Sequence, residues 1–513
     1  MTTTNANILP GSTPIEQEQY LPEGAYVQVM GERYYRIAHY DQMRPFFMSL
    51  VSSGDHWLFI ASTGGLTAGR INADSALFPY ETEDKITAHS EQSGSKTMVR
   101  VTRNGRTHLW EPFSDRYRGL YYCERHLYKN IYGNKLTFEE INHDLGLTMR
   151  IAWRTGDRFG FVKSGRLANV GDSDCCIELL DGLQNLLPYG ANSSLQTNMS
   201  SLLHAYKRNE LEPETGLGIF ALSATISDRA EPSESLKATA VWQVGLDVDC
   251  HLLCTEQLDA FRYGRPLTPE YDICGKAGAY FTLSIFSLPP GTHKQWHITA
   301  DVNQDSAAIT SLIHLLHQDK VVVQQGLEED IDRNTADLIG RVAAADGLQR
   351  SAQETTATHH FANVLFNIMR GGIFANGYLV ERHDVVDFMR ARNRNVLSRH
   401  AGWFEALPAQ LISRDLYAQA GETGDPDLIR LCYEYLADIR PPSWRPQPPL
   451  EPFLYQSQKG RWLAPPRLPG QLARYFPELG TAGVGLSRLY RGIYCQIFEC
   501  HNGRWLQPLP GHS

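Results

Sequence analysis

The stretch LGLTMRIAW, residues 145–153, decides the fold class of this chain. Its apolar residues recur at every second position from Leu145 to Trp153, while Thr148 and Arg150 face the other way. A period of two is that of a β-strand with one buried face and one face in water. The segment therefore predicts a strand in a sheet that covers a core on one side.

The same alternation continues from Tyr26 to about residue 302, with Gly, Pro, Asn or Asp between the segments. The clearest further examples are KTMVRVTR (96–103), GIFALSATI (218–226), ATAVWQVGL (238–246), AYFTLSIFSL (279–288) and HKQWHITADV (293–302). Nothing helical of comparable strength interrupts them, which predicts antiparallel sheets. The region is much longer than a small sandwich of about 100 residues, so we expect a large two-sheet sandwich.

A helical period begins near Asp305. Ile309, Leu312 and Leu316 fall on one helical face, and Asp305 stands where an N-cap belongs. Helical patterns then continue in GLEEDIDRNTADLIGRVAAA (326–345), THHFANVLFNIMRGG (358–372), VVDFMRARNRNVLSRHAGWF (385–404) and a segment that opens with Asp425 and Pro426. In the second of these, Gly371 and Gly372 stand where a C-cap would be. Successive helices with short connections predict the beginning of a helical array.

These patterns divide the chain into five parts. They are a tail (1–25), a β-rich domain (26–302), a helical linker (303–345), the start of the helical array (346–436) and a Pro-rich segment (437–513). The last part holds 12 of the 27 prolines, and by count 9 Lys and Arg against 4 Asp and Glu. Two interpretations of it remain open, namely a Pro-rich linker or tail and a reading frame that slips by one nucleotide at the break.

The composition excludes several classes of protein. The chain has 513 residues with 48 Lys and Arg against 57 Asp and Glu, a net charge of −9, which argues against binding to a phosphate backbone. The N-terminus has no basic segment followed by an apolar one, and no window approaches the ~18 uninterrupted apolar residues of a membrane span. We therefore expect a cytoplasmic protein with no nucleic-acid partner and no membrane contact.

The nine cysteines include no CxxC pair. Cys175 with Cys176, and CHLLC at residues 250–254, could bind a metal ion or be buried free thiols. The segment FEEINHD, residues 138–144, could form a carboxylate pair or a metal cluster. Strand alternation, however, points Glu139 and Glu140 to opposite faces. The sequence therefore predicts no metal site.

Residues 34–84 hold the densest run of residues whose side chains could bind a ligand or take part in a reaction. Turn glycines let the backbone approach a neighbour or ligand, and Arg70, Asn72 and Asp74 supply donors and acceptors for a sugar hydroxyl or a carboxylate. The alternative is a tight hairpin tied by an internal Arg70–Asp74 pair. No GxGxxG follows a strand and no GxxxxGK[ST] occurs, so a nucleotide site is not supported.

Aromatic residues offer a second route to sugar binding. Trp57 and Trp110 could stack on the apolar face of a sugar ring, although a tryptophan beside strand residues also suits a core. Trp110 is followed closely by Asp115 in THLWEPFSDRY, residues 107–117. The residues that we expect to hold a sugar are Arg70, Trp110 and Asp115.

Three segments together resemble the N-terminal part of the cellobiose phosphorylase family. They are FFMSLVSSGDHWLFIASTGGLTAGRINADSALFPYETED (46–84), THLWEPFSDRY (107–117) and FGFVKSGRLANVGDSDCCIELLDGLQNLLPYG (159–190). The resemblance is one of pattern, and it spans about residues 26–436. It implies an N-terminal antiparallel β-supersandwich, a helical linker and the start of an (α/α)6 barrel.

The resemblance also implies a chemistry. An inverting phosphorylase of β-linked glucosides uses one carboxylic acid to protonate the glycosidic oxygen while inorganic phosphate attacks from the opposite face. That acid belongs to the barrel, so no catalytic residue is assigned in this chain, and phosphate is a co-substrate with no cofactor. The expected partners are an oligosaccharide or β-glucoside, phosphate, and a second copy of the chain in a homodimer. The alternatives are a non-catalytic carbohydrate-binding or oligomerisation module and an inverting glycoside hydrolase.

Overall fold

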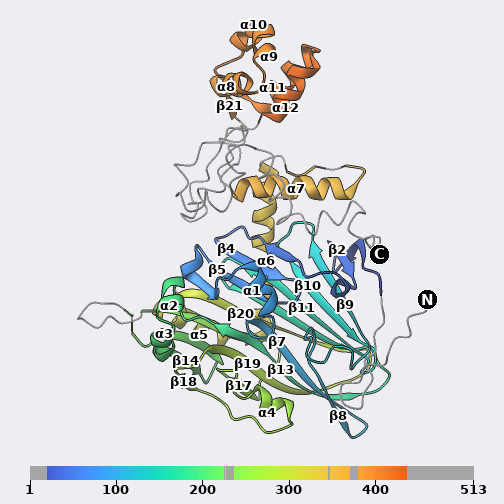
Figure 1. Ribbon diagram of the computed structural model, residues 1–513, viewed down its shortest axis with the longest axis vertical. Coiled ribbons are helices and arrows are strands. Elements are labelled where there is room, and N and C mark those ends of the chain that lie inside the picture. The colour runs from blue at the N-terminus through green and yellow to red at the C-terminus, as the bar shows by residue number, and fades with distance from the viewer. Residues whose placement is uncertain are drawn as a thin grey trace, which may run out of the picture. The chain divides into compact units, whose positions relative to one another are not determined.

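The computed structural model describes residues 20–224, 226, 236–344, 347–349, 351–369 and 379–435 (Figure 1). The chain divides into two compact units, the first ending at Ala336 and the second beginning at Asp337. The Pro-rich segment 437–513, most of the expected tail 1–25 and the expected C-cap at Gly371 and Gly372 lie outside the described residues.

The first unit is built on an antiparallel sheet of eleven strands. In spatial order these strands are β1 (Glu23–Val29), β2 (Glu32–Ala38), β9 (Cys123–Asn130), β10 (Leu136–Asn142), β11 (Leu147–Gly156), β12 (Gly160–Asn169), β20 (His293–Asp305), β16 (Lys237–Val244), β15 (Leu217–Leu222), β14 (Lys207–Glu212) and β18 (Asp272–Cys274). Along β11 buried and half-buried residues alternate, as the apolar pattern predicts. We call this the large sheet.

Two smaller antiparallel sheets accompany the large sheet. One has the order β17 (Cys250–Leu252), β19 (Gly278–Leu288), β13 (Cys175–Leu186), β7 (Gly94–Arg103) and β8 (Arg106–Trp110). The other has the order β3 (Phe47–Leu50), β4 (His56–Ala61), β5 (Leu66–Arg70) and β6 (Ala76–Phe78). The predicted antiparallel β-rich part of the chain is therefore confirmed.

One core joins the five-stranded sheet to the large sheet. Val99 and Ile177 from the smaller sheet belong to the same buried cluster as Ile151 and Phe161 from the large sheet. The two sheets are thus two layers over a shared apolar interior, and Figure 1 shows β7 and β13 lying over strands of the large sheet. We call the opposite face of the large sheet its outer face. A supersandwich of the phosphorylase type stays a prediction.

Helices of the first unit lie between strands or follow the last strand. They are α1 (Glu83–Ala88), α2 (Ser193–Asn198), α3 (Ser200–Tyr206), α4 (Leu258–Arg262), α5 (Ser306–Leu316) and the first part of α6 (Lys320–Ala344), with short 3₁₀ turns η1 (Tyr40–Gln42) and η2 (Ala73–Ser75). The predicted change of period is confirmed, because Asp305 accepts a hydrogen bond from the backbone N–H of Ala308 at the start of α5.

Helix α6 is fixed on the outer face of the large sheet. Its apolar side, including Leu327, packs in one cluster with Trp242. Polar contacts add to this, since Glu328 forms an ion pair of 2.6 Å with Arg154 and Asn334 donates a hydrogen bond of 2.8 Å to Asp157. The helix is therefore part of the β-rich unit up to about Ala336, rather than a free connection.

The second unit is helical in the residues that the structure describes. It contains α7 (Glu354–Met369), α8 (Arg382–Arg392), α9 (Arg394–Arg399), α10 (Ala401–Ala406), α11 (Ser413–Glu422), α12 (Pro426–Glu434) and a two-stranded sheet of β21 (Leu379–Glu381) and β22 (Gln410–Ile412). The expected N-cap at Asp425 is confirmed by its hydrogen bond from the backbone N–H of Asp427. No helix among the described residues has the length and apolarity to cross a membrane.

The helical pattern predicted over residues 385–404 is confirmed, but it is divided among several helices. The structure has three helices there, with breaks at Asn393 and His400. The Asn393 side chain accepts hydrogen bonds from the backbone N–H groups of Asn395 and Val396, so it caps a new helix instead of continuing the old one. The start of an (α/α)6 barrel stays a prediction.

Candidate functional site

A loop that follows β8, residues 110–115, is organised by one buried carboxylate. Glu140 on β10 accepts hydrogen bonds from the indole Nε1 of Trp110 (2.7 Å), the backbone N–H of Phe113 (2.7 Å) and Nε of Arg125 (2.8 Å). Trp110 is only 2% exposed. The indole ring is thus part of the core, and its polar edge is used to fix the loop.

Phe113 has a backbone conformation that bulky residues rarely adopt. Its φ angle is 63°, in the left-handed region. The hydrogen bond from its N–H to Glu140 helps to hold this conformation. Such conformations cost of order 1–3 kcal/mol and persist where the surrounding structure over-determines them, often at functional sites. The loop is therefore one candidate for a functional element, although Ile71, next to Arg70, has a similar φ of 58°.

Arg125 connects this carboxylate to the exposed end of the loop. Its Nη1 donates to Oδ1 of Asp115 at 2.9 Å, and its Nη2 donates to the backbone carbonyl of Ser114 at 2.7 Å. The Asp115 side chain is 59% exposed. Trp110 and Asp115 therefore belong to one network, linked through Glu140 and Arg125, and Asp115 is its most exposed member.

A second carboxylate of the loop, Glu111, is held from the other side. One carboxylate oxygen of Glu111 accepts a hydrogen bond from Nε of Arg262 (2.7 Å), and the other lies 2.7 Å from Nζ of Lys96. The Lys96 Nζ is also 2.5 Å from a carboxylate oxygen of Glu91. Burial alone would raise the pKa of Glu111, but the hydrogen bond from Arg262 and the charge of Lys96 hold that pKa below its usual value. Arg262 also pairs with Asp259 at 2.7 Å, so the two cations are shared among three carboxylates.

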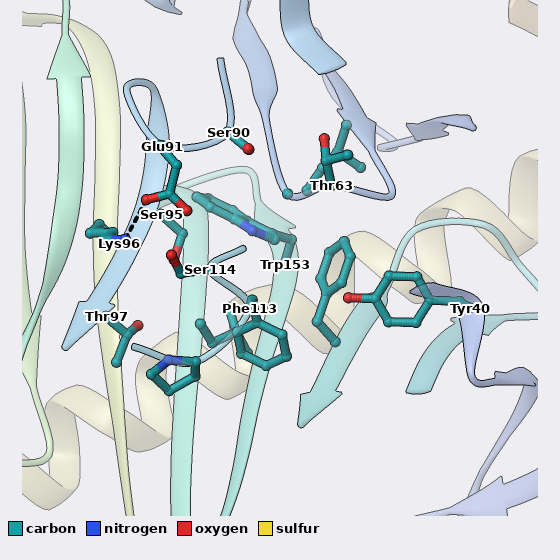
Figure 2. Close-up of a pocket in the computed structure, with 15 residues that line it drawn as sticks. Tyr40, Thr63, Ser90, Glu91, Ser95, Lys96, Thr97, Phe113, Ser114 and Trp153 are labelled. Atoms are coloured by element: carbon teal, nitrogen blue, oxygen red, sulfur yellow. Dashed lines mark hydrogen bonds and ion pairs between the residues drawn. The ribbon is translucent and has the colours of Figure 1, made fainter. Parts of the chain in front are cut away.

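A small pocket lies between this loop and strands β7, β10 and β11 (Figure 2). Its lining combines the charged Lys96 and Glu91, hydroxyl-bearing residues such as Tyr40 and Ser114, and apolar side chains such as Phe138 and Trp153. Its volume is about 40 Å³, enough for roughly three water molecules and far below the ~300 Å³ of a typical small-molecule site. Because Lys96 is already paired with two carboxylates, the pocket suits water or a hydroxyl group better than an anion.

Arg70 lies in a different cluster. Its guanidinium contacts Asp301 (Nε to Oδ1, 2.8 Å), Asp55 (Nη1 to Oδ1, 3.3 Å) and the backbone carbonyl of Asp157 (2.9 Å). Burial raises the pKa of Asp301 to about 6, although the Arg70 charge opposes this. The guanidinium is thus occupied in joining β5 to β20.

The alternative Arg70–Asp74 pair is wrong. Asp74 instead accepts a hydrogen bond from the backbone N–H of Ser193, and Asn72 caps η2 by accepting from the N–H groups of Asp74 and Ser75. The Asn72 cap gives the turn its shape, so the hairpin needs no Arg70–Asp74 contact. The structure therefore joins Trp110 and Asp115 but places Arg70 elsewhere, and sugar binding by the three residues stays a prediction.

The FEEINHD segment separates as strand alternation predicts. Glu140 faces the core, whereas Glu139 faces the outer side, where it accepts hydrogen bonds from Tyr128 (2.5 Å) and Nε of Arg150 (2.6 Å). His143 contacts Glu124 at 2.8 Å. The segment therefore forms no joint carboxylate pair.

One group of possible metal ligands was not visible in the sequence. Ligand atoms of His39, Glu124 and His126 lie within 4.8 Å of one another, because β2 pairs with β9. However, Nδ1 of His126 accepts the backbone N–H of His39 at 3.3 Å. Burial lowers the pKa of His126, so the neutral ring carries its proton on Nε2. A metal-bound imidazole donates from its other nitrogen, and this arrangement is therefore a hydrogen-bonded cluster.

One family model matches this chain. Residues 374–437 match glycoside hydrolase family 149 insertion domain 1. A search of curated proteins found no match.

Solved structures with partial likeness come from several enzyme classes. A bacterial glucoamylase in complex with acarbose is 8% identical, with 71% of this chain and 51% of that chain covered and a TM-score of 0.34. A protein described as a kojibiose phosphorylase from the human microbiome is 8% identical (56% and 35% covered, TM-score 0.28), and a polysaccharide lyase is 11% identical (53% and 34% covered, TM-score 0.29). The chain spans a third to a half of the length of these proteins. Likeness at this level carries no argument about function, so what remains is the similarity of residues 374–437 to an insertion domain of glycoside hydrolase family 149.

Proposed function

We propose that this chain is the N-terminal part of an inverting glycoside phosphorylase that cleaves β-linked glucosides with inorganic phosphate. The observation that carries the proposal is the match of residues 374–437 to an insertion domain of a glycoside hydrolase family. The order of the two units supports it, because a β-rich unit followed by helices is what the family resemblance implies.

The proposed reaction needs two groups on opposite faces of the sugar. A carboxylic acid protonates the leaving oxygen, and phosphate takes the place of the water molecule used by inverting hydrolases. In the proposal the acid lies in the helical barrel. The buried carboxylates Glu111 and Glu140 are poor candidates for the acid, since each is held in place by cationic side chains of the same unit.

The proposal includes a slip of reading frame near residue 436. The change in proline content and in the sign of the charge both occur there, and the stretch matched by the family model ends at residue 437. The DNA downstream of codon 436 should therefore be open in the frame displaced by one nucleotide for several hundred codons. Stop codons soon after the break in that frame would refute the slip.

Product analysis of the protein expressed from the restored frame tests the reaction. Incubated with cellobiose or longer β-glucans, it should release glucose 1-phosphate only when phosphate is present. Release of free glucose without phosphate would assign a hydrolase instead. Sugar binding with no product in either buffer would assign a carbohydrate-binding module.

A further inference from the structure

A row of charged side chains crosses the outer face of the large sheet. The strand register places His126, Glu139, Arg150 and Arg166 directly opposite one another on β9, β10, β11 and β12. They share a face because Leu167, the neighbour of Arg166, lies in the shared core. The row thus brings two arginines side by side on neighbouring strands.

The positive charge of this row exceeds its negative charge. Arg150 pairs with Glu139, which leaves Arg166 with no ion pair to any described residue, and the buried Nε of Arg166 has no hydrogen-bond partner there. Arg36 on β2 is similar to Arg166, because its buried Nε also has no hydrogen-bond partner among the described residues. Its guanidinium carbon lies 6.0 Å from the ring centre of Tyr128. The three guanidinium groups of Arg36, Arg150 and Arg166 therefore share this face with two carboxylates, Glu139 and the Glu124 that contacts His126.

The excess of positive charge on this face destabilises the sheet when no anion is bound. Like charges directly opposite each other destabilise a pair of strands. Desolvation and the charge of Arg150 lower the pKa of Arg166, and the charge of Glu139 opposes this only in part. By contrast, α6 supplies Glu328 to neutralise Arg154 farther along the same face. Arg166 has only the charge of Glu139 to offset it, and Glu139 already forms an ion pair with Arg150.

The row is open to solvent. The Arg150 side chain is 31% exposed, Arg166 is half-buried, and Gln295, which is opposite Arg166 on β20, is exposed. Guanidinium groups form two parallel hydrogen bonds to planar or tetrahedral oxyanions. An anion with several oxygens could therefore receive donors from Arg150 and Arg166 together, and its charge would offset theirs.

We propose that Arg166 and Arg150, with Arg36 nearby, bind an oxyanion of the phosphate type on the outer face of the large sheet. The phosphate could be inorganic or could belong to a sugar phosphate. The inference rests on charge and geometry in the first unit and is independent of the proposed reaction. Glu139 positions Arg150 and sets the net charge of the site.

Equilibrium dialysis of the 513-residue chain against labelled inorganic phosphate, at constant ionic strength, tests the site. Arg166→Gln should weaken binding at least about tenfold, since a charged hydrogen bond is lost. Arg208→Gln is the matched control, because Arg208 lies in the same sheet but pairs with Asp272 and Glu210. It should leave binding within twofold of the parent chain. No binding by the parent chain, or equal binding by the Arg166 variant, would overturn the proposal.

A variant of the carboxylate gives an independent check. Glu139→Gln removes a negative charge beside the arginines and keeps an oxygen that can accept from Arg150, so phosphate should bind more tightly. Unchanged or weaker binding by a folded Glu139→Gln chain would contradict the site. A second dialysis arm with glucose 1-phosphate separates the sources. Binding tenfold tighter than that of phosphate assigns a sugar phosphate, and equal binding assigns the phosphate group alone.

Discussion

Lys163 and Asp181 form a completely buried ion pair across the two layers of the β-rich unit, with 2.7 Å between Nζ and Oδ1. Lys163 belongs to β12 of the large sheet and Asp181 to β13 of the five-stranded sheet. Asp181 also accepts the indole N–H of Trp296 at 2.7 Å and the hydroxyl of Thr97 at 2.5 Å. Burial lowers the pKa of Lys163, and the Asp181 charge opposes that shift. The pair therefore fixes how the two sheets face each other.

Asp181→Ala should lower the free energy of unfolding of the first unit by about 3–5 kcal/mol, because it leaves a buried lysine without its partner. Urea denaturation followed by tryptophan fluorescence measures the loss. Asp247→Ala is the control, since Asp247 pairs with Lys320 at 2.5 Å but both side chains are mostly exposed. Asp247→Ala should lower the free energy of unfolding by less than about 1 kcal/mol. Equal losses in the two variants would show that Lys163 does not depend on the pair.

Glu140→Ala should loosen the loop of residues 110–115. It removes the acceptor for Trp110, Phe113 and Arg125 at once, which we expect to cost about 3 kcal/mol. Limited proteolysis should then cut within the loop well before the parent chain is cut there. Glu178→Ala is a matched control, because Glu178 pairs with Arg100 at a partly exposed position. A protease-resistant loop in the Glu140 variant would contradict its role.

His251 should make the first unit less stable in acid. Burial lowers its pKa from 6.5 to about 4, so between these values the unfolded chain binds a proton that the folded protein does not. The contribution is fully present above pH 6.5 and is lost as the pH falls towards 4. His297 acts in the same direction with a pKa of about 4, whereas Asp301, raised to about 6, acts in the opposite direction.

The measurement is urea denaturation at a series of pH values from 7 to 4. His251→Asn should lose less stability over this range than the parent chain. His108→Asn, at an exposed position of β8, should follow the parent. Parallel curves for the parent and the His251 variant would mean that folding does not shift the pKa of His251.

Limited proteolysis should give a resistant fragment that ends beyond Thr335. The sequence alone predicts a fragment of about residues 26–300, but α6 adds the packing of Leu327 on Trp242 and a hydrogen bond of 2.9 Å from Asn134 to Thr335. A chain of residues 20–305 should accordingly unfold at lower urea than one of residues 20–344. Cleavage of the full chain near residue 305 before any site beyond 335 would disprove the docking of α6.

The strands could be predicted because burial on one face of a sheet leaves apolar residues at every second position of the sequence. This holds for β11, and the Asp305 cap marks the change to helices equally well. Pairings between distant strands leave no such local signal. The partners of Arg70, for example, are Asp55 on the neighbouring hairpin and Asp301 more than two hundred residues later.

Other differences between expectation and structure arise where one residue type can serve two structural roles. The apolar pattern of residues 385–404 suits one helix, but an asparagine at position 393 can satisfy free N–H groups and start a new helix. Trp110 illustrates a site residue whose type fits two roles, because stacking on a sugar and filling a core use the same ring. The unpaired arginines on the outer face were missed because neither Arg36 nor Arg166 has a distinctive sequence neighbour.

The most direct test of the central claim is the release of glucose 1-phosphate from cellobiose by the 513-residue chain, compared with the protein from the restored frame. We expect no phosphate-dependent release by the 513-residue chain, because a general acid alone contributes roughly 10²–10⁴-fold and we place that acid outside this chain. The restored protein should release glucose 1-phosphate. Its phosphate-dependent release by the 513-residue chain would contradict the account and place the active site among the residues described above.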